Sequence, residues 1–386
     1  MHSQNVEPTA KRGHLIPFSY STLWLCLGTM DARIRLAAFG APLFGLLALA
    51  LSALGVGSYV VTGVALVIVV IAAVHHAEVV AHRVGEPFGT LILAVAVTVI
   101  EVGLILSLML ANREAASTLA RDTIFAASMI ILNFLLGLCL LVAAKHQREA
   151  RFTRTGATAA LGTLATLMGL TLVLPNFTTS VPGPVFSYGQ LAFVAAFSLG
   201  LYLTFVFVQT VGNRDYFLPK CEPLVVPEAH AEPPSDRESW LAFAALLVSL
   251  GAVVLLAKSL SGALEQVVAA AGAPRAVVGI AIAAIVLLPE SVAAVRAARA
   301  NRLQTSLNLA LGSALATTGL TIPAVAIASY ALDLPLALGL DAKGIVLLAM
   351  TLFVASLSLA RGRTTVLHGA IHLVIFAAYL VTTVLP

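Results

Sequence analysis

Residues 94–108 read AVAVTVIEVGLILSL, and Glu101 is the one ionisable side chain in this apolar run. With its apolar neighbours the run extends over residues 87–111, which as a helix is long enough to cross about 30 Å of hydrocarbon. A carboxylate near the centre of a bilayer costs on the order of a few kcal/mol, so a function must offset its presence there. The stretch therefore predicts a membrane-spanning helix that carries a functional acid.

The composition of the whole chain places this helix in an integral membrane protein. The 386 residues are 60% hydrophobic and 10% charged, with a mean hydropathy of +1.00, which is far more apolar surface than one soluble core can bury. The apolar runs are uninterrupted, whereas the strands of a membrane barrel alternate over segments of roughly 10 residues. We therefore predict an all-α membrane protein. The cysteines Cys26, Cys139 and Cys221 show neither disulfide nor metal-ligand spacing.

The apolar runs predict eleven membrane spans. They lie near residues 36–54, 57–77, 87–111, 123–144, 156–175, 186–211, 239–258, 276–296, 303–330, 335–360 and 364–385. With the N-terminus in the cytosol, the connections on the cytosolic side hold 17 lysines and arginines and those on the other side hold 5. This positive-inside asymmetry predicts a cytoplasmic N-terminus and a periplasmic C-terminus in a bacterial inner membrane. The net charge of +4 is spread over these connections, so we expect no nucleic-acid partner.

The predicted spans divide into two sets of five. Residues 212–238 are rich in proline and acid and have no apolar period, which indicates a cytosolic linker. The predicted order is a non-cleaved cytosolic tail (1–34), an extra transmembrane helix (35–56), a first five-helix repeat (57–211), the linker (212–238) and a second repeat (239–386). Because five is odd, the two repeats must enter the membrane with opposite orientations, as in inverted-repeat transporters.

The two repeats each place one acid at the same depth. Glu101 falls fourteen residues after Pro87, and Glu290 falls fourteen residues after Ala276 in the oppositely oriented helix. The next spans align as AASMIILNFLLGL (126–138) and LGSALATTGLTIP (311–323). This alignment pairs Ser128 with Ser313 and Asn133 with Thr318.

Two buried carboxylates predict a site that alternates between a cation and protons. Desolvation and mutual repulsion both penalise the doubly ionised empty pair, whereas two protons or a divalent cation neutralise it. Calcium prefers six to eight oxygen ligands, and the candidates for supporting ligands are Ser128, Asn133, Ser313, Thr317 and Thr318. Interrupted helices would add free carbonyls, and the candidates for such breaks are Pro289, Gly312, Gly319 and Pro323.

Three segments resemble a known family. Residues 75–105, 286–308 and 308–325 are similar to the signature segments of the ChaA-type calcium/proton and sodium-potassium/proton antiporters, in the calcium:cation antiporter superfamily. The resemblance implies two inverted five-helix repeats, with Glu101 and Glu290 as the alternating cation and proton site. Many exchangers of the superfamily have a Gly-Asn pair ahead of each acid. Here the corresponding pairs are Val97-Thr98 and Leu287-Leu288.

A second cluster of titratable residues lies at the end of the second span. His75, Glu78 and His82 share one helix face, with Glu86 nearby, and could give protons access to the site or bind a transition metal. An intramembrane metalloenzyme or metal sensor built on His75, Glu78 and His82 is therefore one alternative function. A passive cation channel is another. His368 and His372 near the last span are expected to be interfacial.

These observations predict a secondary antiporter, not an enzyme. It would export Ca²⁺, or else Na⁺ or K⁺, in exchange for protons by alternating access. The chain has no GxxxxGK[ST] loop, so an ion gradient is the expected driving force, and no cofactor is expected. The expected partners are the lipid bilayer, small inorganic cations and protons. Homo-oligomers are compatible with the sequence, which does not reveal the oligomeric state.

Overall fold

The computed structural model describes residues 20–56, 58–84, 88–111, 116–146, 149–218 and 234–385, and nearly all of them are helical. The N-terminal helices are α1 (Tyr20–Ala53), α2 (Tyr59–Val84), α3 (Phe88–Ala111), α4 (Ala116–Met129), η1 (Ile130–Leu135), α5 (Leu136–His146), α6 (Arg154–Met168), η2 (Gly169–Val173), η3 (Leu174–Phe177), α7 (Tyr188–Phe207), η4 (Val208–Gly212) and η5 (Arg214–Tyr216). The C-terminal helices are α8 (Asp236–Ala270), α9 (Ala276–Val286), α10 (Leu288–Arg299), α11 (Leu303–Ala316), η6 (Thr317–Thr321), α12 (Ile322–Leu332), α13 (Ala342–Leu359) and α14 (Val366–Val384). One two-residue pairing, β1 (Ala150–Arg151) with β2 (Arg363–Thr364), is antiparallel.

The all-α prediction is confirmed, but the number of spans is not. Within the described residues, eight helices are long and apolar enough to cross a membrane, or nine if the bent pair α9 and α10 forms one span. The two other expected spans lie in α1 and α3, where the apolar stretches Ala37–Ala53 and Ala94–Leu110 are shorter than the others. Eleven spans therefore remain a prediction.

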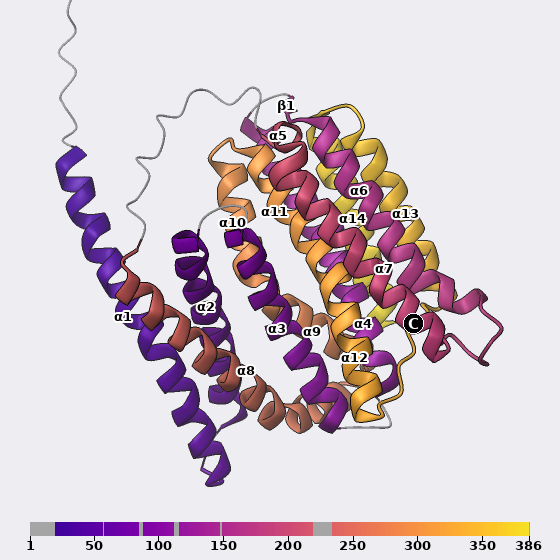
Figure 1. Ribbon diagram of the computed structural model, residues 1–386, viewed down its shortest axis with the longest axis horizontal. Coiled ribbons are helices and arrows are strands. Elements are labelled where there is room, and N and C mark those ends of the chain that lie inside the picture. The colour runs from indigo at the N-terminus through magenta and orange to yellow at the C-terminus, as the bar shows by residue number, and fades with distance from the viewer. Residues whose placement is uncertain are drawn as a thin grey trace, which may run out of the picture.

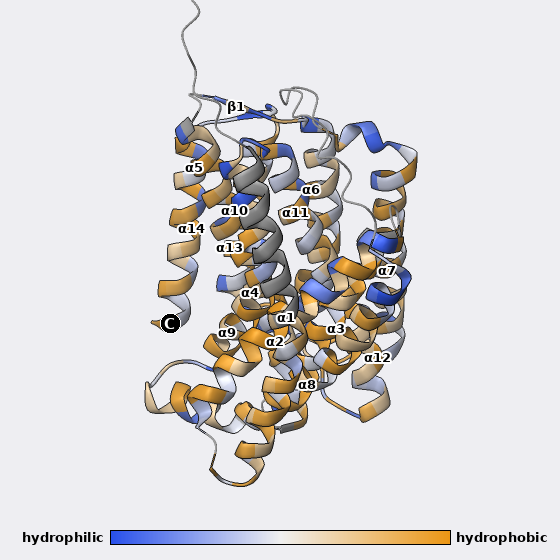
Figure 2. Cartoon of the chain, turned by 90° about the vertical axis from the view of Figure 1, so that its left-hand side faces the viewer, coloured by the Kyte–Doolittle hydropathy of each residue, from blue (hydrophilic) through white to orange (hydrophobic). Residues whose placement is uncertain are grey.

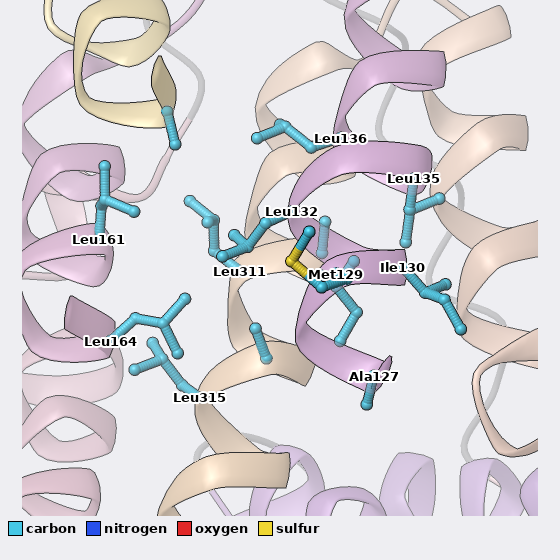
Figure 3. Close-up of a cluster of buried hydrophobic side chains, with 14 of the residues drawn as sticks. Ala127, Met129, Ile130, Leu132, Leu135, Leu136, Leu161, Leu164, Leu311 and Leu315 are labelled. Atoms are coloured by element: carbon cyan, nitrogen blue, oxygen red, sulfur yellow. The ribbon is translucent and has the colours of Figure 1, made fainter. Parts of the chain in front are cut away.

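The helices form two groups with α3, α9 and α10 between them (Figure 1). One cluster of buried hydrophobic residues joins α1, α2, α3, α8 and α9. A larger cluster joins α4 to α7 with α10 to α14. Figure 3 shows part of the larger cluster, in which leucines of α4–η1–α5, α6 and α11 meet around Met129. Hydrophilic residues are prominent near β1 and the neighbouring helix ends, whereas the flanks of the helices are mostly hydrophobic (Figure 2).

Several helices are interrupted within their spans. The 123–144 span changes from α-helix to π-helix at η1, and the 303–330 span does so at η6. These interruptions overlap in the alignment of the two proposed repeats, which supports the repeat hypothesis. The axes of α9 and α10 meet at 56°, with Pro289 in the first turn of α10, where a missing N–H is tolerated.

The other expected breaks differ in outcome. Gly319 lies in η6, and Pro323 lies in the first turn of α12 that follows it. The expected break at Gly312 is wrong, because Gly312 lies inside the continuous helix α11. A glycine inside a helix costs only about 1 kcal/mol relative to alanine, which the contacts around α11 can offset.

The predicted tail and linker are partly helical. Helix α1 begins at Tyr20, within the expected tail, and residues 1–19 lie outside the described residues. Helix α8 begins at Asp236, within the expected linker, because Ser235 and Glu238 form a capping box there. Residues 219–233 of the linker also lie outside the described residues.

Helices α5 and α14 cross with their backbones in contact. A Cβ atom added at Gly369 would lie 2.7 Å from the carbonyl oxygen of Gly137. A Cβ atom added at Gly137 would lie 3.0 Å from the carbonyl oxygen of Gly369. Small residues permit this close approach between membrane helices.

We expect Gly369→Ala to destabilise the fold by about 1–3 kcal/mol, because the new methyl group would overpack the crossing. The measurement is the midpoint of thermal unfolding in detergent. Gly162→Ala on α6 is the matched control, since nothing lies within 4 Å of its added Cβ atom. An unchanged midpoint for Gly369→Ala would contradict the close crossing.

Candidate functional site

Glu101 and Glu290 line one cavity of about 390 Å³. Glu101 comes from the middle of α3, and Glu290 comes from the first turn of α10, just after the bend. The other lining residues come from α3, α7, η4, α11, η6 and the segment after η5. They are Ala94, Val97, Thr98, Tyr202, Phe205, Val206, Gln209, Phe217, Leu218, Thr305, Asn308, Leu309, Gly312, Ser313, Ala316 and Thr317.

The Glu101 carboxylate is buried and hydrogen-bonded to η6. Its side chain is 3% exposed, and the Thr321 hydroxyl donates to Glu101 Oε2 at 2.8 Å. Thr317, also in η6, lines the same cavity as this carboxylate. Thr317 and Thr321 lie four residues apart, so their side chains share one face of the helix. The sequence predicted Thr317 and Thr318 as ligands but not Thr321, because the contact between Thr321 and Glu101 joins residues 220 positions apart.

The π-helix η6 also packs closely against α7. A Cβ atom at Gly319 would lie 2.6 Å from Cβ of Tyr202. Glycine is therefore required where these two elements meet, and Tyr202 forms part of the cavity wall. The Gly319 position thus shapes the cavity through contact with a neighbouring helix.

The Glu290 carboxylate has an unsatisfied oxygen. Glu290 as a whole is half-buried. Its Oε2 atom, however, is inaccessible to solvent and has no hydrogen-bond partner among the described residues. Glu290 interacts electrostatically with both Glu101 and Glu78. In the described part of the chain, no lysine or arginine, Arg296 included, forms an ion pair with Glu101 or Glu290. A buried carboxylate without a partner is costly unless a proton or cation neutralises it.

Three residues with hydroxyl groups lie on the cavity wall. They are Thr98, Ser313 and Thr317. Ser128 and Thr318 donate to carbonyls of their own helices, at 2.8 and 2.5 Å, and are not cavity-lining residues.

Asn133 lies outside the cavity as well. Its Nδ2 donates to Thr351 Oγ1 of α13 at 2.9 Å. The sequence could not reveal this partner, because α13 is more than two hundred residues away along the chain. The expectation that Asn133 is a direct cation ligand is therefore not supported by its position.

The titratable cluster of α2 does not form a metal site in the described residues. No group of three or more His, Cys, Asp or Glu side chains there could hold a metal ion. Glu78 and His82 are exposed, His75 is half-buried, and Glu86 lies outside the described residues. Buried His76 has a different role, because its Nε2 contacts the carbonyl oxygen of Ala38 on α1 at 3.1 Å.

The prediction that His372 is interfacial is wrong. Its side chain is 0% exposed, and both ring nitrogens contact polar side chains of other elements. The close crossing of α5 and α14 explains this, because Gly369 lies one turn before His372 and brings the helix backbone inward.

The cavity reaches the end of the bundle at which the linker begins. Gln209, Thr305, Phe217 and Leu218 belong to this part of its wall. Asn308 Nδ2 donates to the carbonyl oxygen of Phe217 at 2.7 Å, which ties the segment after η5 to α11. The cavity thus connects the two acids with one end of the bundle.

A family model described as sodium/calcium exchanger protein matches residues 54–211 and 241–385. The chain belongs to this family. It is 50% identical over 317 residues to a protein of Sinorhizobium fredii (strain NBRC 101917 / NGR234) named as an ionic transporter, y4hA, covering 82% of this chain and 86% of that one. It is 36% identical over 311 residues to the sodium-potassium/proton antiporter ChaA of Escherichia coli (strain K12), covering 80% and 84%.

Two solved structures share the fold. The structure of native YfkE has a TM-score of 0.67 at 17% identity and covers 89% of this chain and 99% of its own. The H⁺/Ca²⁺ exchanger CAX has a TM-score of 0.68 at 15% identity and covers 91% of this chain and 88% of its own.

These matches confirm the resemblance to the ChaA-type antiporters and the superfamily. The chain is a multi-pass membrane protein and a cation antiporter. Members of this family are transporters, so this protein is a transporter and not the metalloenzyme considered as an alternative.

The neighbouring threonines of η6 give a direct test of the Glu101 contact. We expect Thr321→Val to weaken apparent cation affinity about tenfold, because a hydrogen bond to a charged group contributes about 1.5–3 kcal/mol. Thr318→Val is the matched control, since the Thr318 hydroxyl bonds only to its own helix. Cation-dependent exchange in vesicles measures both. Equal effects of the two substitutions would contradict the assigned contact.

Proposed function

We propose that this protein exports Ca²⁺ in exchange for protons and that Glu101 and Glu290 bind both ions in turn. The observation that carries the proposal is that two carboxylates line one cavity without a cationic side chain to pair them in the described residues. Na⁺ and K⁺ are the alternative cargo ions, because the relative ChaA is named as a sodium-potassium/proton antiporter.

The antiport mechanism follows from the cost of the empty, ionised site. With both acids protonated the cavity is neutral, and with one divalent cation bound to two carboxylates it is also neutral. The doubly charged state with neither ion is strongly disfavoured in a site shielded from water. The protein can therefore change its accessible side when loaded with cation or with protons, which couples the two fluxes.

The oxygen donors favour calcium over a monovalent ion. Two carboxylates match the charge of one divalent cation, and the hydroxyls of Thr98, Ser313 and Thr317 are further hard ligands. The two solved structures that share this fold are of proteins named as a Ca²⁺/H⁺ antiporter, YfkE, and an H⁺/Ca²⁺ exchanger, CAX. Their names agree with calcium as the cargo.

The excess of lysine and arginine on one side of the membrane predicts which end of the cavity faces the cytosol. It assigns the linker to the cytosol, so the cavity end at Gln209 and Leu218 would face the cytosol of a bacterial cell. In that orientation the acids receive cation from the cytosol for export across the inner membrane.

Glu78 is the group best placed to give protons access to the site. Its side chain is exposed, and it interacts electrostatically with Glu290. His75 and His82 lie on the same helix face as Glu78. Proton transfer would then proceed from this face of α2 to Glu290.

We expect Glu101→Gln and Glu290→Gln each to abolish calcium-driven discharge of a preset pH gradient in everted vesicles. An amide cannot take up and release the proton that the exchange requires. Glu149→Gln is the matched control, because Glu149 is an exposed acid that pairs with Arg363 at the bundle end. Parallel additions of Ca²⁺, Na⁺ and K⁺ to the parent protein identify the cargo.

Two results would contradict the proposal. Exchange at the parental rate in either glutamine variant would show that the acids are not the site. Calcium flux in the parent protein that continues without proton counter-movement would instead indicate a channel.

A further inference from the structure

A chain of buried hydrogen bonds outside the cavity links η1 to α13 and α14. The Ser358 hydroxyl contacts His372 Nε2 at 3.2 Å, and His372 Nδ1 contacts Asn133 Oδ1 at 3.4 Å. Asn133 Nδ2 donates to Thr351 Oγ1 at 2.9 Å. Thr351 Oγ1 donates to the sulfur of Met129 at 3.6 Å. We call these four polar residues and Met129 the histidine network.

The histidine network is self-consistent as a set of donors and acceptors. A neutral His372 with its proton on Nδ1 donates to Asn133 and accepts from Ser358, so one tautomer satisfies both contacts. The four polar side chains are at most 2% exposed. In an apolar core an unpaired polar group costs about 1–3 kcal/mol, so a fully paired network of this kind holds one geometry.

The glycine crossing explains how His372 reaches η1. Gly137 and Gly369 let the backbones of α5 and α14 touch, and a Cβ atom at Gly137 would lie 2.9 Å from Cβ of His372. The His372 ring contacts Asn133, which lies within the π-helix. The network therefore fixes a π-helical turn that the local sequence does not fix alone.

This π-helical turn supports the helix that carries Glu290. Helix α10 packs against η1 and α5, and α11, which lines the cavity, packs against η1 from another side. A shift of η1 would therefore move part of the surface against which α10 packs. None of the network residues lines the cavity itself.

We infer that His372 is a positioning residue for cation binding. It holds η1, and through η1 the helix of Glu290, in the geometry that binds the cation. This inference rests on the proposed function of Glu290 and gives Asn133 an indirect role through His372.

The test compares His372→Leu and His372→Gln in the full-length protein reconstituted in vesicles, with Ca²⁺ and, separately, Na⁺ as probes. We expect His372→Leu to raise the apparent KM for the transported cation about tenfold, as loss of supporting contacts around metal ligands typically does, while Vmax changes less than twofold. His372→Gln should recover much of the affinity, because its amide can both donate and accept.

Ile375→Ala is the matched control for loosened packing. Ile375 is buried on the same helix but has no polar contact with the network. It should lower the thermal midpoint while leaving KM close to the parental value. If His372→Leu does not reach the membrane, Ser358→Ala removes one contact of the same ring and should raise KM about threefold.

The outcomes separate this inference from the proposed function. A parental KM in His372→Leu, or in Ser358→Ala where that variant replaces it, would overturn the inference while leaving the exchange mechanism intact. An equal rise of KM in Ile375→Ala would also overturn it, because general loosening would then explain the effect. Absence of exchange in the parent protein would instead overturn the proposed function.

Discussion

Two carboxylates share a cavity inside this membrane protein, and burying both in the ionised form carries a large free-energy cost. The rest of the site is arranged around this cost. Neither Glu101 nor Glu290 has a lysine or arginine partner in the described residues, and one oxygen of Glu290 has no hydrogen bond there. Such a pair is unstable when both groups are ionised and the site is empty. In the proposed mechanism, protons or a divalent cation relieve this repulsion, so their binding would be mutually exclusive.

The fold brings this pair together from distant parts of the chain. Glu101 lies on α3, whereas Glu290 lies in the first turn of α10, after the 56° bend between α9 and α10 (Figure 1). The π-helix η6 supplies the Thr321 hydroxyl to Glu101. On the far side of α10, the histidine network fixes η1 by contacts with α13 and α14. The two acids are thus held by different parts of the bundle.

The sequence predicted the features that depend on residue chemistry and depth. Long apolar runs indicate helices directly, and a lone acid within one is conspicuous because burial makes it expensive. The sequence could not predict features that depend on helix register or tertiary contacts. Thr321 was not predicted because its contact with Glu101 is a tertiary one between residues 220 positions apart. Asn133 was expected to bind the cation because its partners, Thr351 and His372, lie far away in sequence.

The most direct test of the account measures proton release when calcium binds to the purified protein in detergent. A pH-sensitive dye in weak buffer reports the protons while a calcium titration reports binding. We expect calcium to displace protons in the parent protein, and we expect the replacement of both Glu101 and Glu290 with glutamine to abolish the release. Calcium binding to the parent protein without any proton release would contradict this expectation.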